Sequence, residues 1–252
     1  MALNINSINN RIPSEHGLNY RVTNNFIDES APSQIYCVKQ SVTTSDTPVD
    51  IIDQSYYFGS IGEAMQMSSS SDSDTMMMAV YYYVDINAEE PSIEIVTLNG
   101  RTPVTLNNNI YRISRIVCAN ALNQGTVYLY KSGSSVSNGV PSENILCCVK
   151  SNIGFSQQSY LYIPKGWTAY LISMNISGTQ STDNSHNIKA YRLFANGLKY
   201  EVQNLNLYRD MIYEEHLAPG ITENSTYILN IKKSNILSSS TCTILYNFIL
   251  LR

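Results

Sequence analysis

The chain has 252 residues, of which 43% are apolar and only 14% are charged. An ordinary globular domain carries about 25% charged residues, so polar neutral side chains and 19 tyrosines replace charge here. The apolar fraction suffices for a buried core, which excludes a chain disordered by high charge. The net charge of −4 excludes the basic surface that nucleic-acid binding requires.

The cysteines and the N-terminal residues indicate in which cellular compartment the protein is made. The five cysteines are odd in number and form no C-x-x-C pair, which argues against a zinc site and a disulfide framework. We expect reduced, mostly buried thiols. The first residues lack the basic and apolar regions of a signal peptide, and no window approaches the roughly 18 apolar residues of a membrane helix. We therefore expect synthesis in a reducing cytoplasm and no membrane span.

Residues 1–32 are polar, contain two prolines, and show no sustained hydrophobic period. We expect them to form an extended arm that becomes ordered against a partner surface. From residue 33 onward, short segments rich in Tyr, Val, Ile and Thr stand between turn residues, a pattern typical of strands. The expected strands span residues 34–42, 76–86, 92–98, 110–119, 126–131, 144–149, 159–163, 167–176, 189–194, 199–202, 227–231 and 241–250.

Turn signals separate these strands. Residues 68–74 are expected to be a flexible loop or a strand end, and only residues 60–67 and 205–216 offer short helix candidates. Many short strands at a spacing of about 8–12 residues indicate a β-sandwich or a barrel. Tight hairpins are predicted at three pairs of residues that tolerate positive φ, namely Asn99-Gly100, Asn138-Gly139 and Asn196-Gly197.

The three histidines offer little chemistry. His16 lies in the arm and His186 in a Ser/Asn/Asp loop, so both are expected to be solvated. His216 follows Glu214 and Glu215, but H-E-x-x-H is absent and no second histidine is near in sequence. A solvated strand end is therefore the better interpretation of His216 than a metal ligand.

Other chemistry-bearing residues also favour structural roles. Cys147 and Cys148 lie in an apolar run, where burial without a nearby cation raises a thiol pKa and makes the pair inert. Asp72 and Asp74 lack the glycine and the distal glutamate of a calcium loop. Trp167 is expected to open a strand and to pack in the core.

No nucleophile elbow, phosphate-binding loop or dinucleotide-binding fingerprint occurs. We therefore predict no enzymatic activity and no catalytic, cofactor-binding or metal-binding residue. A glycoside-active β-sandwich stays open as a third hypothesis, because two acids distant in sequence can converge in space.

Strand parity makes two further groups informative. Residues 81–83 are three consecutive tyrosines, whose rings must leave opposite faces of one strand. They are either an interface, since interfaces are rich in Tyr, or a core position at Tyr82 between surface positions. Arg112 and Arg115 fall on opposite faces, so one of them is a candidate for an internal partner, with a solvated edge as the alternative.

Several motifs carry a family resemblance when taken in order. They are V-T-L-N-G-R-T-P-V at 96–104, Y-R-I-S-R at 111–115, I-P-K-G-W-T-A-Y-L at 163–171 and a final alternating strand at 246–251. Over about residues 55–252 the chain resembles a family of virion structural proteins of tailed phages and large DNA viruses. Lys165 and Trp167 depart from the Ala and Lys common in that family. Three methionines at 76–78 stand where it has a glycine-rich stretch.

The resemblance implies an antiparallel β-sandwich of jelly-roll type spanning residues 33–252 as one domain behind the arm at 1–32. A small subdomain before residue 76 is the alternative division. It implies a non-enzymatic virion subunit, made in the host cytoplasm, that is a decoration, minor capsid, vertex or head-fibre protein. Expected partners are other virion proteins, namely major capsid, neck or vertex proteins, and further copies of the chain, with a trimer favoured. No cofactor is expected.

A second hypothesis comes from another class of function. Neutral polar loops rich in Tyr and Asn suit sugar recognition, so the chain could be a host-surface or carbohydrate-binding module of a phage fibre or tail. Specific binding to a host polysaccharide would discriminate this module from a purely architectural subunit.

Overall fold

The computed structural model describes residues 34–39, 47–48, 56–178, 186–207, 211–213, 220–233 and 242–251. The strands in these ranges pair antiparallel throughout, which confirms the all-β expectation. The same residues contain no helix, and hence none long and apolar enough to cross a membrane. The expected arm at residues 1–32 lies outside the described ranges.

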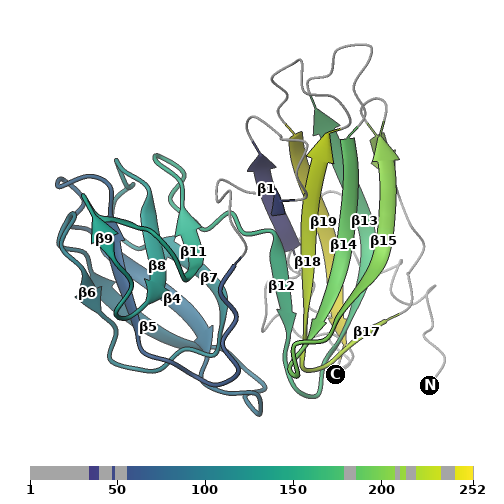
Figure 1. Ribbon diagram of the computed structural model, residues 1–252, viewed down its shortest axis with the longest axis horizontal. Helices are drawn as coiled ribbons and strands as arrows, with labels where there is room; N and C mark the ends of the chain where they lie inside the picture. The colour runs from purple at the N-terminus through teal and green to yellow at the C-terminus, as the bar shows by residue number, and fades with distance from the viewer. Residues whose placement is uncertain are drawn as a thin grey trace.

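The strands gather into two lobes, seen side by side in Figure 1. The inserted lobe, residues 56–159, holds a four-stranded sheet in the order β11-β8-β3-β6, a three-stranded sheet β5-β4-β7 and the hairpin β9-β10. Its strands are β3 (Met65–Ser69), β4 (Met77–Tyr83), β5 (Ser92–Thr97), β6 (Val104–Thr105), β7 (Arg112–Cys118), β8 (Val127–Lys131), β9 (Val136–Ser137), β10 (Val140–Pro141) and β11 (Ile145–Val149).

The main lobe is built from both ends of the chain. One sheet has the order β1-β19-β13-β16 with β17 beside β13, and the other has the order β12-β18-β14-β15 with β2 beside β18. Its strands are β1 (Gln34–Lys39), β2 (Thr47–Pro48), β12 (Tyr160–Ile163), β13 (Thr168–Gly178), β14 (His186–Phe194), β15 (Lys199–Leu207), β16 (Met211–Tyr213), β17 (Ile221–Thr222), β18 (Ser225–Lys233) and β19 (Cys242–Leu251).

The main lobe has a regular pairing order once the two-residue strands β2 and β17 are set aside. The first strand pairs with the last (β1 with β19), the second with the seventh (β12 with β18), the third with the sixth (β13 with β16), and the fourth with the fifth (β14 with β15). This is the pairing of one long antiparallel ribbon wound around a core. Pairing of β13 with β19 and of β14 with β18 joins the ribbon into two sheets.

Each lobe has a hydrophobic cluster between its sheets, and the cluster of the inserted lobe extends across the junction to Tyr160 and Ile228 of the main lobe. In the inserted lobe, Met67 of β3 and Val80 of β4 come from different sheets and meet in one cluster. In the main lobe, Leu229 of β18 and Phe248 of β19 do the same. The sequence predicts one sandwich over residues 33–252, whereas the described strands surround two clusters, because the chain leaves the main lobe after β2 and returns at β12. Whether the lobes fold as one domain or two stays a prediction.

Both helix candidates are wrong within the described residues. Residues 60–64 contain no helix, and Met65–Ser69 is strand β3. Met65 and Met67 are both buried and Gln66 between them is less so, which is the two-residue period of a strand. Burial of this face overrides the helix propensity of Ala, Met and Gln. In the second candidate, residues 205–207 end β15 and Met211–Tyr213 is β16, while the rest lies outside the described ranges.

Two of the three predicted Asn-Gly hairpins are confirmed, at residues 138–139 and 196–197, whereas Asn99-Gly100 forms a tight turn closed by an isolated bridge between Asn99 and Thr102. Asn138 and Gly139 join β9 to β10 with φ of 50° and 75°, the left-handed pair of a type I′ turn. Gly100 and Gly197 also have positive φ, 56° and 83°, at the other two reversals. Gly139 is the most constrained, because a Cβ there would lie 1.8 Å from the backbone oxygen of Ser69.

Gly139→Ala is expected to lower the free energy of unfolding by about 2 kcal/mol, because the methyl group adds a backbone clash to the cost of a left-handed conformation. Gly197→Ala is the matched control. It has the same sign of φ but nothing within 4 Å of the added Cβ, so only about 1 kcal/mol of conformational cost is expected. Urea unfolding of both variants measures the difference, and equal losses would contradict the clash at Gly139.

Candidate functional site

The residues considered for chemistry are built into the framework of the protein. His186 is the first residue of β14 and only 1% exposed, so its expected solvation is wrong. Strand β14 begins at His186, three residues before the predicted start at 189. Because alternate residues of a strand face the same side, His186 points to the core together with Ile188 and Ala190. His16 and His216 lie outside the described residues.

Asp74 is a buried structural carboxylate rather than part of a loop for calcium. Its Oδ1 accepts a hydrogen bond from the backbone N–H of Gln124 at 2.7 Å, and its Oδ2 accepts bonds from the N–H of Gly125 at 2.9 Å and from the hydroxyl of Ser69. Asp72 is exposed and pairs with Arg101 at 3.2 Å. Residues 68–74 are therefore a strand end and a tight turn closed around Asp74. In the described ranges, no group of three His, Cys, Asp or Glu could hold a metal ion.

The described cysteines fit the expected structural role. Cys147, Cys148 and Cys242 are buried, as predicted for most of the thiols. Cys118 is half-buried, and its burial raises the pKa of the thiol, which disfavours the thiolate that nucleophilic chemistry needs. The side chain of Cys37 lies outside the described residues.

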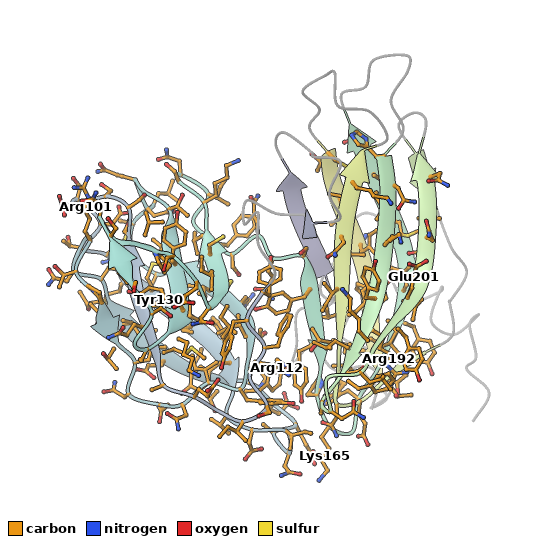
Figure 2. All side chains as sticks on the ribbon, in the orientation of Figure 1. Arg101, Arg112, Tyr130, Lys165, Arg192 and Glu201 are labelled. Atoms are coloured by element: carbon orange, nitrogen blue, oxygen red, sulfur yellow. The ribbon has the colours of Figure 1, made fainter. Side chains whose placement is uncertain are left out.

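Arg112 occupies an aromatic cage where the two lobes meet (Figure 2). Its guanidinium carbon lies 4.1 Å from the ring centroid of Tyr111, 5.3 Å from that of Phe58 and 6.0 Å from that of Tyr162. Its Nη1 donates to the backbone oxygens of Gly59 at 2.8 Å and of Tyr111 at 2.7 Å. Burial lowers the pKa of Arg112, and the ring faces and carbonyl dipoles take the place of a counterion.

The predicted placement of Arg112 and Arg115 on opposite faces is wrong, because a β-bulge at Ser114 pairs Arg115 with Tyr81 and Arg112 with Tyr83, two residues on one face of β4. The expectation that one of the two arginines has internal partners is confirmed by Arg112. Arg112 is only 3% exposed, whereas Arg115 is exposed and lies over the ring of Tyr81 at 4.3 Å. The three tyrosines at 81–83 occupy three different environments. Tyr82 is in the core of the inserted lobe, Tyr83 is buried beside Arg112 in the lobe junction, and Tyr81 is half-buried on the outer face of its sheet.

Further aromatic contacts connect the lobes. Tyr83 packs edge-on against Tyr162 of β12 with ring centroids 4.9 Å apart, and Tyr56 packs against Tyr160 at 4.6 Å. Burial raises the pKa of both Tyr83 and Tyr162 well above the usual value, so their hydroxyls stay neutral. Trp167 is buried directly before β13, as predicted, and its indole N–H donates to the backbone oxygen of Glu89 in the inserted lobe at 3.0 Å. The junction therefore fixes the lobes against each other.

The sheet β5-β4-β7 carries an apolar outer face that sequence analysis missed. Side chains at alternate positions point away from the core, and register places Ile93 beside Tyr81, and Ile95 beside Ala79. Ile93 is 55% exposed and Ile95 is 53% exposed. We call this surface the apolar sheet face; its residues are Met77, Tyr81, Ile93, Ile95 and Val117, which surround the buried Ala79. The alternation in I-E-I-V was visible in the sequence, but which side faces the core was not.

The main lobe carries a contrasting polar surface on β14 and β15. The side-chain amide of Asn187 donates to Asn204 at 2.6 Å and to Asn206 at 2.8 Å. Asn204 donates in turn to Glu201 at 2.9 Å, and Lys189 pairs with the same carboxylate at 3.0 Å. Hydrogen bonds from Lys189 and Asn204 lower the pKa of Glu201. The face is neutral and amide-rich, the chemistry that sugar hydroxyls prefer.

A charged clamp fixes the first residues of the inserted lobe to β8. Lys131 pairs with Glu63 at 2.7 Å and donates to the hydroxyl of Tyr57 at 3.0 Å, while that hydroxyl donates to Glu63. Burial raises the pKa of Glu63, but the hydrogen bonds from Lys131 and Tyr57 outweigh it and hold the pKa below the usual 4.5. The hydrogen bonds from Lys131 to Glu63 and Tyr57 also raise the pKa of Lys131, which makes it a poor nucleophile.

This clamp gives a pH dependence of defined sign. A carboxylate whose pKa is lowered by folding contributes stability above its unfolded pKa of 4.5 and loses it as the pH falls through the folded value. The melting temperature of the wild type is therefore expected to exceed that of Glu63→Gln at about pH 7, and the difference to shrink as the pH drops below about 4.5. Exposed Glu143→Gln, with the same change in net charge, is the control. A wild-type advantage that persists at low pH would contradict the clamp.

Comparisons with known proteins leave the family open. No protein-family profile matches the chain, and no curated protein matches it significantly. Among solved structures, the VP2 subviral particle of infectious bursal disease virus aligns with 11% identity and a TM-score of 0.21, over 93% of this chain and 74% of that one. The Gt strain of the same virus aligns with 10% identity and a TM-score of 0.19, over 92% and 74%. These similarities to a viral particle protein are weak, and TM-scores this low do not establish a shared fold.

Proposed function

We propose that this protein is a structural subunit of a virion that acts by protein–protein assembly. The observation that carries the proposal is the strand pairing of the main lobe, a ribbon of eight strands that pairs first with last and second with seventh. Eight antiparallel strands in two sheets joined in this way form a jelly roll, a fold found in viral capsid proteins, lectins and cupins. Because a fold does not by itself set a function, the surfaces must discriminate among these classes.

The surfaces favour assembly. The apolar sheet face presents two isoleucines that are each more than half exposed, and β15 adds Tyr200 at 52% and Val202 at 49%. Protein interfaces are rich in aromatic residues and poor in Lys, Glu and Asp, which agrees with the 14% of charged residues in this chain. The buried acids Asp74 and Glu94 and the clamped Glu63 make structural contacts, which supports a non-enzymatic role without a cofactor.

In this proposal the protein is capsid-associated, as a decoration, minor capsid, vertex or head-fibre subunit of a tailed phage or a large DNA virus. Its partners are other virion proteins and further copies of itself, with a trimer favoured. The inserted lobe is connected to the jelly roll between the first two strands of that fold, β1 and β12. It therefore lies beside the two sheets and does not interrupt their hydrogen bonding. This placement leaves the apolar sheet face available for assembly.

A carbohydrate-binding module is the second candidate, and the amide network of Asn187, Asn204 and Asn206 favours it. Lectins also use the jelly-roll fold, and a neutral amide surface can both donate to and accept from sugar hydroxyls. In that case Asn187→Ala and Asn204→Ala would abolish glycan binding without changing the oligomeric state.

Sedimentation analysis of the purified full-length chain tests the proposal. A discrete homo-oligomer, or addition to assembled virus particles in a co-sedimentation assay, is the expected result. A glycan array on the same preparation addresses the second candidate. A stable monomer that binds no particle but binds one class of glycan would overturn the assembly role. Glycan turnover, lost on mutation of a carboxylate, would overturn both candidates.

A further inference from the structure

The fold of the single chain supplies no explanation for the apolar sheet face. Cross-strand register places its residues in contiguous rows, with Ile95 and Val117 in one row, on either side of the buried Ala79, and Ile93 and Tyr81 in the next. Single exposed apolar residues are common, but a contiguous apolar patch marks an interaction site. Arg115, over the ring of Tyr81, is the one charged side chain that register places in these rows.

The edge of this face is also open to strand addition. Strand β5 is the outermost described strand of its sheet. Natural proteins protect such edges with charged residues, proline or bulges. The outward side chains of β5 are instead Ile93, Ile95 and Thr97, all β-branched, while the one charged residue of the strand, Glu94, is buried and accepts hydrogen bonds from Asn107. An extended segment that pairs with β5 would continue both the backbone ladder and the apolar rows.

The chain has a segment of suitable length and pattern. The described residues begin at Gln34, the first residue of β1 in the main lobe, so 33 residues precede it. Fully extended, 33 residues reach about 110 Å, which is far enough to leave one molecule and dock on the next. Within this segment, L-N-I-N at residues 3–6 and Y-R-V-T at residues 20–23 alternate apolar or aromatic with polar residues, the period of an added strand.

We infer that residues 1–33 of a second copy dock on the apolar sheet face by adding a strand along β5. The inference rests on the proposed assembly role and identifies one partner in it. Each copy then donates its N-terminal segment from the main lobe and accepts another on the inserted lobe. Such a head-to-tail exchange closes into a ring when the rotation between copies allows it.

Photo-crosslinking between isotopically distinct copies tests the inference. The full-length protein carries p-benzoylphenylalanine in place of Ile95 and is mixed with isotope-labelled protein that lacks the probe. The expected crosslink joins position 95 to a labelled peptide from residues 1–33. The same probe in place of Ile61, which is 68% exposed elsewhere in the inserted lobe, is the control and is expected not to capture that peptide. A crosslink to the probe's own N-terminal segment only, or to none, overturns the inference.

A charge substitution supplies an independent readout. Ile95→Lys is expected to weaken self-association at least about tenfold, because the buried apolar contact is replaced by a desolvated charge. Ile61→Lys is expected to leave self-association unchanged. Both sites are exposed, so melting temperatures near wild type verify that the variants fold. An oligomer indifferent to Ile95→Lys contradicts this inference alone, whereas a wild-type chain that is always monomeric contradicts the assembly role as well.

Discussion

Asp74→Ala is expected to lower the free energy of unfolding by about 4 kcal/mol. Asp74 is fully buried, and its carboxylate accepts hydrogen bonds from two backbone N–H groups and one hydroxyl. The donors at Gln124 and Gly125 belong to the loop between β7 and β8, so the carboxylate connects that loop to the turn before β4. Removing it leaves several donors without an acceptor, and each unsatisfied buried donor costs about 1–3 kcal/mol.

Asp72→Ala is the matched control for Asp74→Ala. It removes the same charge from the same turn, but Asp72 has a side chain that is 73% exposed and a single ion pair with Arg101. Exposed ion pairs contribute roughly 0–1 kcal/mol, so Asp72→Ala should unfold close to wild type. Chemical denaturation of both variants gives the comparison. Similar losses would mean that the turn responds to net charge, and the structural role assigned to Asp74 would be wrong.

Arg112→Lys is expected to cost about 3 kcal/mol even though it keeps the positive charge. The planar guanidinium stacks on aromatic rings from both lobes and donates to two backbone carbonyls. An ammonium group is more strongly hydrated and cannot stack, so lysine would bury a charge with fewer compensating contacts. Because Tyr162 belongs to the main lobe, the variant should also loosen the lobe junction.

Arg115→Lys, three residues further along β7, is the control for Arg112→Lys. Arg115 is exposed and contacts one ring, so the expected loss is below about 0.5 kcal/mol. Thermal unfolding measures stability, and amide hydrogen exchange at residues 56–59 and 160–163 reports on the junction. Equal stability losses, or unchanged exchange in Arg112→Lys, would contradict the cage.

The sequence was most informative where local periodicity decides the outcome. Every strand predicted from β-branched and aromatic runs is present, although the ends shift by a few residues. The type I′ turn at Asn138-Gly139 follows from local backbone sterics. Strand parity failed for Arg112 and Arg115, because the β-bulge at Ser114 brings both to one face of β7. Strands β3 and β16 fell in the two helix candidates. In β3, Ala, Met and Gln suit a helix until Met65 and Met67 become buried on one face.

The candidate sites depended more on tertiary structure. No local signal shows that Asp74 would meet the backbone of Gln124, or that His186 would point inward, because both depend on partners or strand limits set by the whole fold. The apolar sheet face likewise depends on which side of β5 faces the core. In I-E-I-V, alternation places Ile93 and Ile95 on one side of the strand and Glu94 and Val96 on the other. The structure buries the second pair, with Glu94 hydrogen-bonded to Asn107 and Asn108.

The scarcity of charge is a property of the sequence itself, and the strands and the tight turns follow from it because each depends on residues a few positions apart. The division into two lobes was decided only by tertiary structure. Gln34 pairs with Asn247 across almost the whole chain, and the inserted lobe lies between these partners in sequence. Such pairings are selected by the core they enclose and by the loop entropy they must overcome. Neither quantity can be read from a local pattern.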